Sequence, residues 1–127
     1  MKKIWTNGCF DILHRGHIEL LKYCASLGDR VIVGLNSDKS VKNLKGTNRP
    51  IFSEADRKFC LESIRFVDEV LVFDEKTPYN LIRAVQPDVI VKGGDYKIDS
   101  VVGSDLCEVR IFDYVEGYST TQILGDR

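Results

Sequence analysis

The stretch that decides the fold reads Thr6-Asn7-Gly8-Cys9-Phe10-Asp11-Ile12-Leu13-His14-Arg15-Gly16-His17. The apolar pair Ile4-Trp5 comes directly before it. Apolar residues at helical spacing follow it: Ile18, Leu21, Cys24 and Ala25. This order predicts a turn between a first strand and a first helix. In an open parallel α/β sheet, ligands bind at the carboxyl ends of the strands, where a helix N-terminus suits phosphate.

Two glycines and two histidines give this turn its predicted chemistry. Gly8 and Gly16 allow the backbone to turn sharply or to approach a ligand closely. His14 and His17 lie three residues apart, so a helical turn places both imidazoles on one side. They are the only histidines in the chain. The pair fits a polyphosphate undergoing substitution; the alternative is two polar residues at a helix entry, one of them capping it.

Composition narrows the class of protein. The 127 residues fit one domain, spanning residues 1–127, with 43% hydrophobic and 29% charged residues. The formal net charge of −1 gives no basic field for nucleic acid. Neither a signal peptide nor a membrane-spanning apolar run is present, so we expect no membrane partner. Four widely spaced cysteines without a Cys-x-x-Cys motif argue against zinc and favour reduced thiols in the cytoplasm, with Cys24 and Cys60 in the core.

Strand and helix patterns alternate along the whole chain. Strands are expected at residues 3–6, 30–35, 69–73, 88–92 and 108–112. Helices are expected at residues 17–27, 53–66 and 78–85, with a short one after residues 117–121. This alternation predicts a single doubly wound, Rossmann-like α/β domain with about five parallel strands and right-handed crossovers.

Local signals set several of these boundaries. Gly28 is expected to end the first helix, Ser53 to cap the second, and Thr77 to cap the third with Pro78 at its first position. On the second helix, three side chains are expected to face inward: Phe59, Cys60 and Ile64. Residues 39–50 are expected to form a basic loop with at most one helical turn.

This basic loop follows the carboxyl end of a strand, on the same side as the turn at residues 6–17, called the signature turn below. Its cations could form a solvated face or contact phosphate. We favour phosphate contact for Lys45, whereas both interpretations stay open for Lys42 and Arg49. A second loop, at residues 92–96, follows the fourth strand, and Asp95 there could accept hydrogen bonds from a ribose or a base. Near the C-terminus, hydroxyls at the start of a helix could bind phosphate: Ser119, Thr120 and Thr121.

The segments Gly8-Cys9-Phe10-Asp11 and His14-Arg15-Gly16-His17 resemble the nucleotidyltransferase superfamily that carries a His-x-Gly-His signature. The resemblance implies the strand order 3-2-1-4-5, Mg²⁺ bound with a nucleoside triphosphate, and a homodimer. It also implies direct transfer, in which a phosphate oxygen of the acceptor attacks the α-phosphorus and pyrophosphate leaves. Catalytic roles fall on His14, His17, Lys45 and Arg57. Nucleotide contacts fall on Gly8, Cys9, Phe10, Gly16, Gly93, Asp95, Ser119, Thr120 and Thr121. Acceptor contacts fall on Asp11, Asp38 and Lys42, and no protein ligands to a metal are expected.

Two branches of that superfamily compete. Motifs such as residues 34–38, 91–96 and 116–121 look like the branch that adenylylates heptose 1-phosphate with ATP, and this resemblance is the closer one and spans nearly the whole chain. The other branch makes CDP-glycerol from CTP and glycerol 3-phosphate, and it usually carries an arginine where this chain has Tyr114 or Val115. A shorter segment between Asp95 and Glu116, and the absence of the kinase domain often fused to heptose enzymes, count against the first branch. A nucleotide-binding module without turnover is the third alternative, against which the intact histidine pair speaks.

Overall fold

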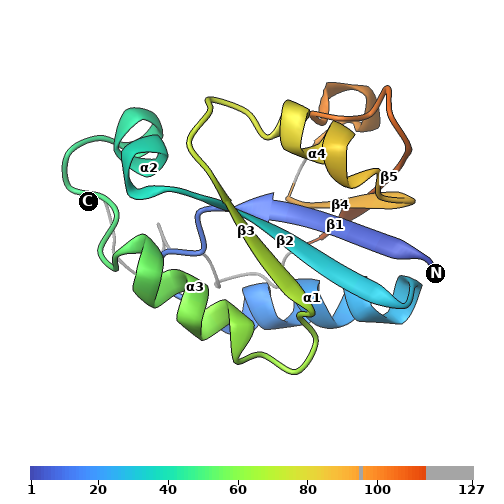
Figure 1. Cartoon of the computed structure of the whole chain (residues 1–127), viewed down its shortest axis with the longest axis horizontal. Coiled ribbons are helices and arrows are strands. Elements are labelled where there is room, and N and C mark those ends of the chain that lie inside the picture. Colours follow the sequence, from blue (N-terminus) through green and yellow to red (C-terminus); the bar gives the residue numbers. More distant parts are fainter. Residues whose placement is uncertain (95, 114–127) are drawn as a thin grey trace.

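The computed structural model describes residues 1–94 and 96–113, which fold around one all-parallel sheet (Figure 1). Its five strands are β1 (Lys3–Gly8), β2 (Arg30–Asn36), β3 (Glu69–Phe73), β4 (Val89–Gly93) and β5 (Glu108–Phe112). Their order in the sheet is β3-β2-β1-β4-β5. This order confirms the predicted Rossmann-like topology, and it places the signature turn after the central strand.

Helices cover both faces of the sheet. The helices are α1 (Arg15–Leu27), α2 (Asp38–Lys45), α3 (Glu54–Glu62) and α4 (Tyr79–Val85), with a short 3₁₀ turn η1 (Ile98–Ser100). Figure 1 shows α1 and α3 on one face, α4 on the other, and α2 beyond the end of β2. Each face has its own buried core, one including Leu21 and Leu61, the other including Trp5 and Ile82. Both faces of the central strands are therefore apolar, as a doubly covered sheet requires.

Trp5 packs on the α4 face of the sheet against Gly34, where any larger residue would collide with the indole. Its side chain is fully buried. A Cβ on Gly34 of the neighbouring strand would lie 2.4 Å from the indole Cζ2. The indole Nε1 donates a hydrogen bond of 2.9 Å to Oδ1 of Asn7. Core packing on this face thus extends to a polar side chain at the carboxyl end of β1.

The second predicted helix differs from the structure in length and in its inward face. Helix α3 begins after the cap Ser53, as predicted, but it ends at Glu62 instead of near residue 66. Phe59 is 71% exposed, and Cys60 is exposed as well, so their predicted inward orientation is wrong. The buried positions are Arg57 and Leu61, four residues apart. An arginine takes the inward face because its donors find acceptors there, as described below. Cys24 is buried, as predicted.

Other predicted helix boundaries differ from those of the structure by only a few residues. The expected single turn in the basic loop is the two-turn helix α2, which Ser37 caps through its hydroxyl and Gly46 ends at φ +94°. Its Asp38 and last-turn lysines suit the helix dipole. Pro78 itself is the cap residue of α4, so the cap predicted at Thr77 is displaced by one residue. Helix α1 ends before Gly28, as predicted. The predicted C-terminal helix lies outside the described residues.

Within residues 1–94 and 96–113, no helix is long and apolar enough to cross a membrane.

Candidate active site

A cavity of about 450 Å³ lies at the carboxyl ends of β1, β2 and β4. Residues of the signature turn, of α2 and of the loops before α3 and α4 surround it. Its lining comprises Asn7, Gly8, Cys9, Phe10, Asp11, His17, Asn36, Leu44, Lys45, Arg49, Lys76, Thr77, Pro78, Lys92, Gly93, Tyr96 and Val102. This volume is typical of a small-molecule site. It lies at the topological switch point, where open α/β sheets bind ligands.

His14 and His17 form the N-terminal cap of α1. The Gly16 amide donates to Nδ1 of His14 at 3.0 Å, and the His14 amide donates to Nδ1 of His17 at 3.3 Å. The two imidazoles stack with their ring centroids 3.9 Å apart. The predicted placement of both rings on one side is therefore confirmed. Capping, raised above as an alternative for one histidine, applies to both.

These caps determine which nitrogen carries the proton. Because each Nδ1 accepts a backbone N–H, a neutral ring must carry its hydrogen on Nε2. Burial lowers the pKa of His14, and burial, His14 and Lys45 lower the pKa of His17 to about 4. Both rings are thus neutral at pH 7. The pair offers two Nε2–H donors beside the N-terminus of α1, where donors and dipole favour an anion.

The basic loop divides into residues that reach the cavity and one that does not. Lys45, on the last turn of α2, and Arg49 both line the cavity. The positive charge of Lys45 also helps to lower the pKa of His17, because it disfavours a second positive charge on that imidazole. Lys42 is exposed and does not line the cavity. The structure thus places Lys45 and His17 in the lining of the same cavity. The predicted contact between Lys42 and the acceptor stays a prediction.

Asp11 fastens the segment that contains Arg49. Its carboxylate accepts Nε of Arg49 at 2.8 Å, and it also accepts the amides of Ile51 and Phe52. Burial alone would raise the pKa of Asp11, but the Phe52 and Ile51 amides and the Arg49 guanidinium outweigh it and lower that pKa. Asp11 lines the cavity as an ionised group that already has partners. Its predicted contact with the acceptor stays a prediction.

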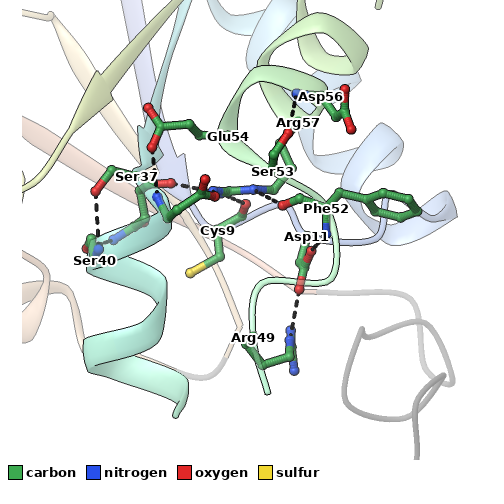
Figure 2. A network of polar contacts seen from close by, with 12 residues as sticks. Cys9, Asp11, Ser37, Ser40, Arg49, Phe52, Ser53, Glu54, Asp56 and Arg57 are labelled. Atoms are coloured by element: carbon green, nitrogen blue, oxygen red, sulfur yellow. Dashed lines mark hydrogen bonds and ion pairs between the residues drawn. The ribbon is translucent and has the colours of Figure 1, made fainter. Parts of the chain in front are cut away.

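Arg57 joins four segments of the chain around the cavity (Figure 2). Its side chain is nearly inaccessible, with the residue 2% exposed. The guanidinium donates to the carbonyl oxygens of Cys9, Asn36 and Phe52 and to the Asp38 carboxylate at 2.8–2.9 Å. The Asp38 amide in turn donates to Glu54, which follows the cap of α3. These contacts explain why an arginine faces inward on α3.

Arg57 and Asp38 are therefore placed differently from the ligand contacts that the resemblance implied. Neither lines the cavity, and each faces the other across an ion pair of 2.8 Å. Gly16 lies within α1, and its amide is bound to His14. Four further predicted contacts fall outside the described residues: Asp95, Ser119, Thr120 and Thr121.

Several cavity residues were not assigned by sequence reasoning. Asn7, Lys76, Thr77, Lys92 and Tyr96 line the cavity without having been named as individual site residues. Asn7 and Lys92 stand at the carboxyl ends of β1 and β4, so their position in the expected topology could have marked them. Lys76 and Thr77 precede α4, and no local pattern distinguishes them from an ordinary loop.

The signature cysteine carries no charge at neutral pH. Burial raises the pKa of the Cys9 thiol, and this outweighs the opposite effect of three nearby cations, Lys45, Arg57 and Arg49. A thiol in this state is a poor nucleophile. In the described ranges, 1–94 and 96–113, no group of three or more His, Cys, Asp or Glu side chains is arranged to hold a metal ion. The cavity therefore offers hydrogen-bond donors and cations to a ligand.

A doubly wound parallel sheet, with imidazole donors at the N-terminus of its first helix and Lys45 lining the same cavity, defines a nucleotide-phosphate-binding α/β domain. Residues 5–124 match the cytidylyltransferase-like family, and the chain belongs to that family. This confirms the superfamily resemblance and the predicted enzyme class, a nucleotidyltransferase.

Similar proteins agree with this assignment. The chain is 57% identical over 122 residues to the bifunctional protein HldE of Nitratiruptor sp., covering 95% of this chain and 26% of that protein. It is 54% identical over 124 residues to the bifunctional protein HldE of Helicobacter pylori strain J99, covering 97% and 27%. The chain thus spans about a quarter of the length of these relatives. Among solved structures, a lipopolysaccharide core biosynthesis protein of Thermoplasma volcanium matches with a TM-score of 0.74 and 30% identity, covering 94% of this chain and 99% of that one.

Proposed function

We propose that this chain transfers adenylate from ATP to heptose 1-phosphate, forming ADP-heptose and releasing pyrophosphate. The observation that carries the proposal is the pair of Nε2–H donors of His14 and His17 at the N-terminus of α1, beside Lys45. High identity to HldE proteins and a structural neighbour named for lipopolysaccharide core biosynthesis favour heptose as the acceptor.

The chemistry follows from these donors. A phosphate oxygen of the acceptor forms a bond to the α-phosphorus of ATP. The bond from that phosphorus to the bridging oxygen breaks, and pyrophosphate leaves with the electron pair. Negative charge grows on the α-phosphate oxygens and the leaving group, where the imidazole N–H groups and Lys45 stabilise it. No covalent enzyme intermediate is needed, in line with the neutral Cys9 thiol.

Mg²⁺ enters this proposal as part of the substrate. The triphosphate oxygens supply hard ligands for Mg²⁺, whereas the one carboxylate among the residues found to line the cavity, that of Asp11, already accepts Arg49 and two amides. Bound Mg²⁺ neutralises charge on the β- and γ-phosphates. The protein residues of the described part then bind and orient the remaining phosphate oxygens.

Pyrophosphate release tests the proposal. With Mg²⁺ present, ATP, CTP, GTP and UTP are each combined with heptose 1-phosphate and with glycerol 3-phosphate. Turnover confined to ATP with heptose 1-phosphate supports the proposal. Turnover with CTP and glycerol 3-phosphate supports the second candidate, the enzyme that makes CDP-glycerol. Binding of nucleotide without turnover of any pair indicates a non-catalytic module.

Two finer expectations accompany the proposed activity. We expect the enzyme to act in the cytoplasm, where ATP is available, and to assemble as a homodimer, as the superfamily resemblance implies. Light scattering at micromolar concentration measures the mass directly. A monomeric mass contradicts the dimer and leaves the proposed reaction in place.

A further inference from the structure

Lys92 is a partly buried cation in the cavity, without a carboxylate partner among the residues that the structure describes. It stands at the carboxyl end of β4 and lines the cavity. Its Nζ lies 4.8 Å from the ring centroid of Tyr96. Within residues 1–94 and 96–113, it forms no ion pair with a carboxylate. Burial, and to a smaller extent Lys45, lower the pKa of Lys92. A cation held in this way is stabilised when an anion enters the cavity.

Asn7 supplies a second donor on the same face of the sheet. Trp5 pairs with Ile90 in the parallel register of β1 and β4. Since side chains alternate along a strand, Asn7 and Lys92, each two residues further on, share the face of that pair. The Trp5 indole can only donate, so its bond to Asn7 fixes the amide oxygen. The amide NH₂ of Asn7 is then left to donate at the cavity end of β1.

Asn7 and Lys92 stand on β1 and β4, whereas His14 and His17, the histidine wall of the cavity, begin α1. His14 and Lys45 influence the pKa of His17, whereas Lys45 and Cys9 influence the pKa of Lys92. Lys45 is thus the cation common to both groups. In the sheet, β4 flanks β1 on one side, and β2, which leads into α2, flanks it on the other. The cavity therefore has cations on both sides of the signature turn.

The proposed reaction brings two anions into this cavity. The attacking oxygen approaches the α-phosphorus opposite the leaving pyrophosphate, so the acceptor phosphate and the β- and γ-phosphates lie on opposite sides of the reacting centre. The histidine wall and the N-terminus of α1 provide for the triphosphate. A phosphate monoester on the far side needs a cation of its own, because two close dianions repel each other strongly.

We propose that Lys92, with the Asn7 amide beside it, binds the phosphate monoester of the acceptor and positions its oxygen for attack on the α-phosphorus. This inference rests on the proposed nucleotidyl transfer. It holds for either candidate acceptor, since both are phosphate monoesters of polyhydroxylated compounds. Lys92 then determines affinity for the acceptor, and affinity for the nucleotide depends on the histidine wall.

The test compares Lys92→Met with the matched control Lys97→Met. Lys97 is an exposed lysine five residues further on that does not line the cavity. Pyrophosphate release is measured with the nucleotide and acceptor that the wild type uses, each varied in turn. We expect Lys92→Met to raise KM for the acceptor at least tenfold, with KM for the nucleotide within twofold of wild type. Lys97→Met stays within twofold for both, and Lys92→Arg recovers part of the acceptor affinity.

A binding measurement keeps the inference separate from the proposed reaction. Calorimetry titrates heptose 1-phosphate into protein saturated with α,β-methylene-ATP, and in a second series glycerol 3-phosphate into protein saturated with α,β-methylene-CTP, since both analogues resist cleavage. Acceptor binding that Lys92→Met weakens tenfold supports the inference even if the wild type releases no pyrophosphate, an outcome that would contradict only the proposed function. Weaker binding of the nucleotide analogue with unchanged acceptor binding overturns the inference, as does unchanged acceptor binding in a folded variant. So does a wild type that binds neither acceptor.

Discussion

His14 and His17 stack with ring centroids 3.9 Å apart, and each uses Nδ1 to accept a backbone N–H at the start of α1. One structural task, capping the helix, thereby fixes the tautomer that the proposed reaction needs. Both Nε2 atoms carry hydrogen while the rings stay neutral. The capping role of the pair and its proposed catalytic role are therefore complementary, and substitutions can separate them.

Asparagine separates the two roles because its side-chain oxygen replaces Nδ1 but nothing replaces Nε2. We expect His14→Asn and His17→Asn to keep the cap of α1 and a native far-UV spectrum. Turnover in pyrophosphate release should fall by a factor of at least about 100 in each, as on removing one donor to a developing oxyanion. A folded His17→Asn protein with the wild-type rate would exclude the proposed mechanism.

The low pKa of His17 predicts that stability depends on pH. In the unfolded chain this histidine titrates near 6.5, whereas in the folded protein its pKa is about 4. Between these values the unfolded state binds the proton first, so the free energy of unfolding falls as the pH is lowered. The loss reaches at most about 3 kcal/mol. Urea unfolding at pH 7.5, 6, 5 and 4 measures this loss. In His17→Asn the part of the loss that comes from His17 should be absent. If the free energy of unfolding falls equally with pH in both proteins, His17 is not its source.

Arg57 is expected to stabilise the architecture of the site. Arg57→Lys leaves carbonyl oxygens of Cys9, Asn36 and Phe52 without their donor, so we expect the free energy of unfolding to fall by at least about 3 kcal/mol. The comparison variant is Asp38→Asn, which keeps an acceptor oxygen for Arg57 at a side chain that is 38% exposed, so its loss should be smaller than that of Arg57→Lys. Urea unfolding compares the two. A fully stable Arg57→Lys protein with reduced turnover would instead favour the direct ligand contact that the resemblance implies.

Gly34 connects core packing to the cavity. A Cβ there would meet the Trp5 indole at 2.4 Å, so Gly34→Ala must displace that ring and the Asn7 amide bound to it. We expect a destabilisation of about 1–3 kcal/mol. Since Trp5 is the only tryptophan in the chain, a shift in fluorescence emission reports the displacement directly. Gly46→Ala serves as control: its Cβ meets no atom within 4 Å, so only backbone strain at φ +94° applies and the emission should stay unchanged.

The sequence by itself determined the parallel α/β sheet, the strand–turn–helix at the signature and the cap at Ser53. These features depend on periodicity and on short-range capping, which neighbouring residues encode. The placement of His14 and His17 on one side also followed from their spacing, whereas the stacking of their rings is a finding of the structure. The strand order came from the resemblance, since periodicity carries no information on which strands are neighbours.

Only the tertiary structure decided what the long polar side chains do. Arg57 turns inward because its acceptors come from residues 21 and 48 positions away in the sequence. Asp11 is bound by a segment about 40 residues further on, whereas Lys92 and Asn7 share one face of the sheet through the pairing of β1 with β4. A charged side chain is stable inside a protein only where partners satisfy it. Those partners are assembled by the fold, so local sequence patterns could not assign them.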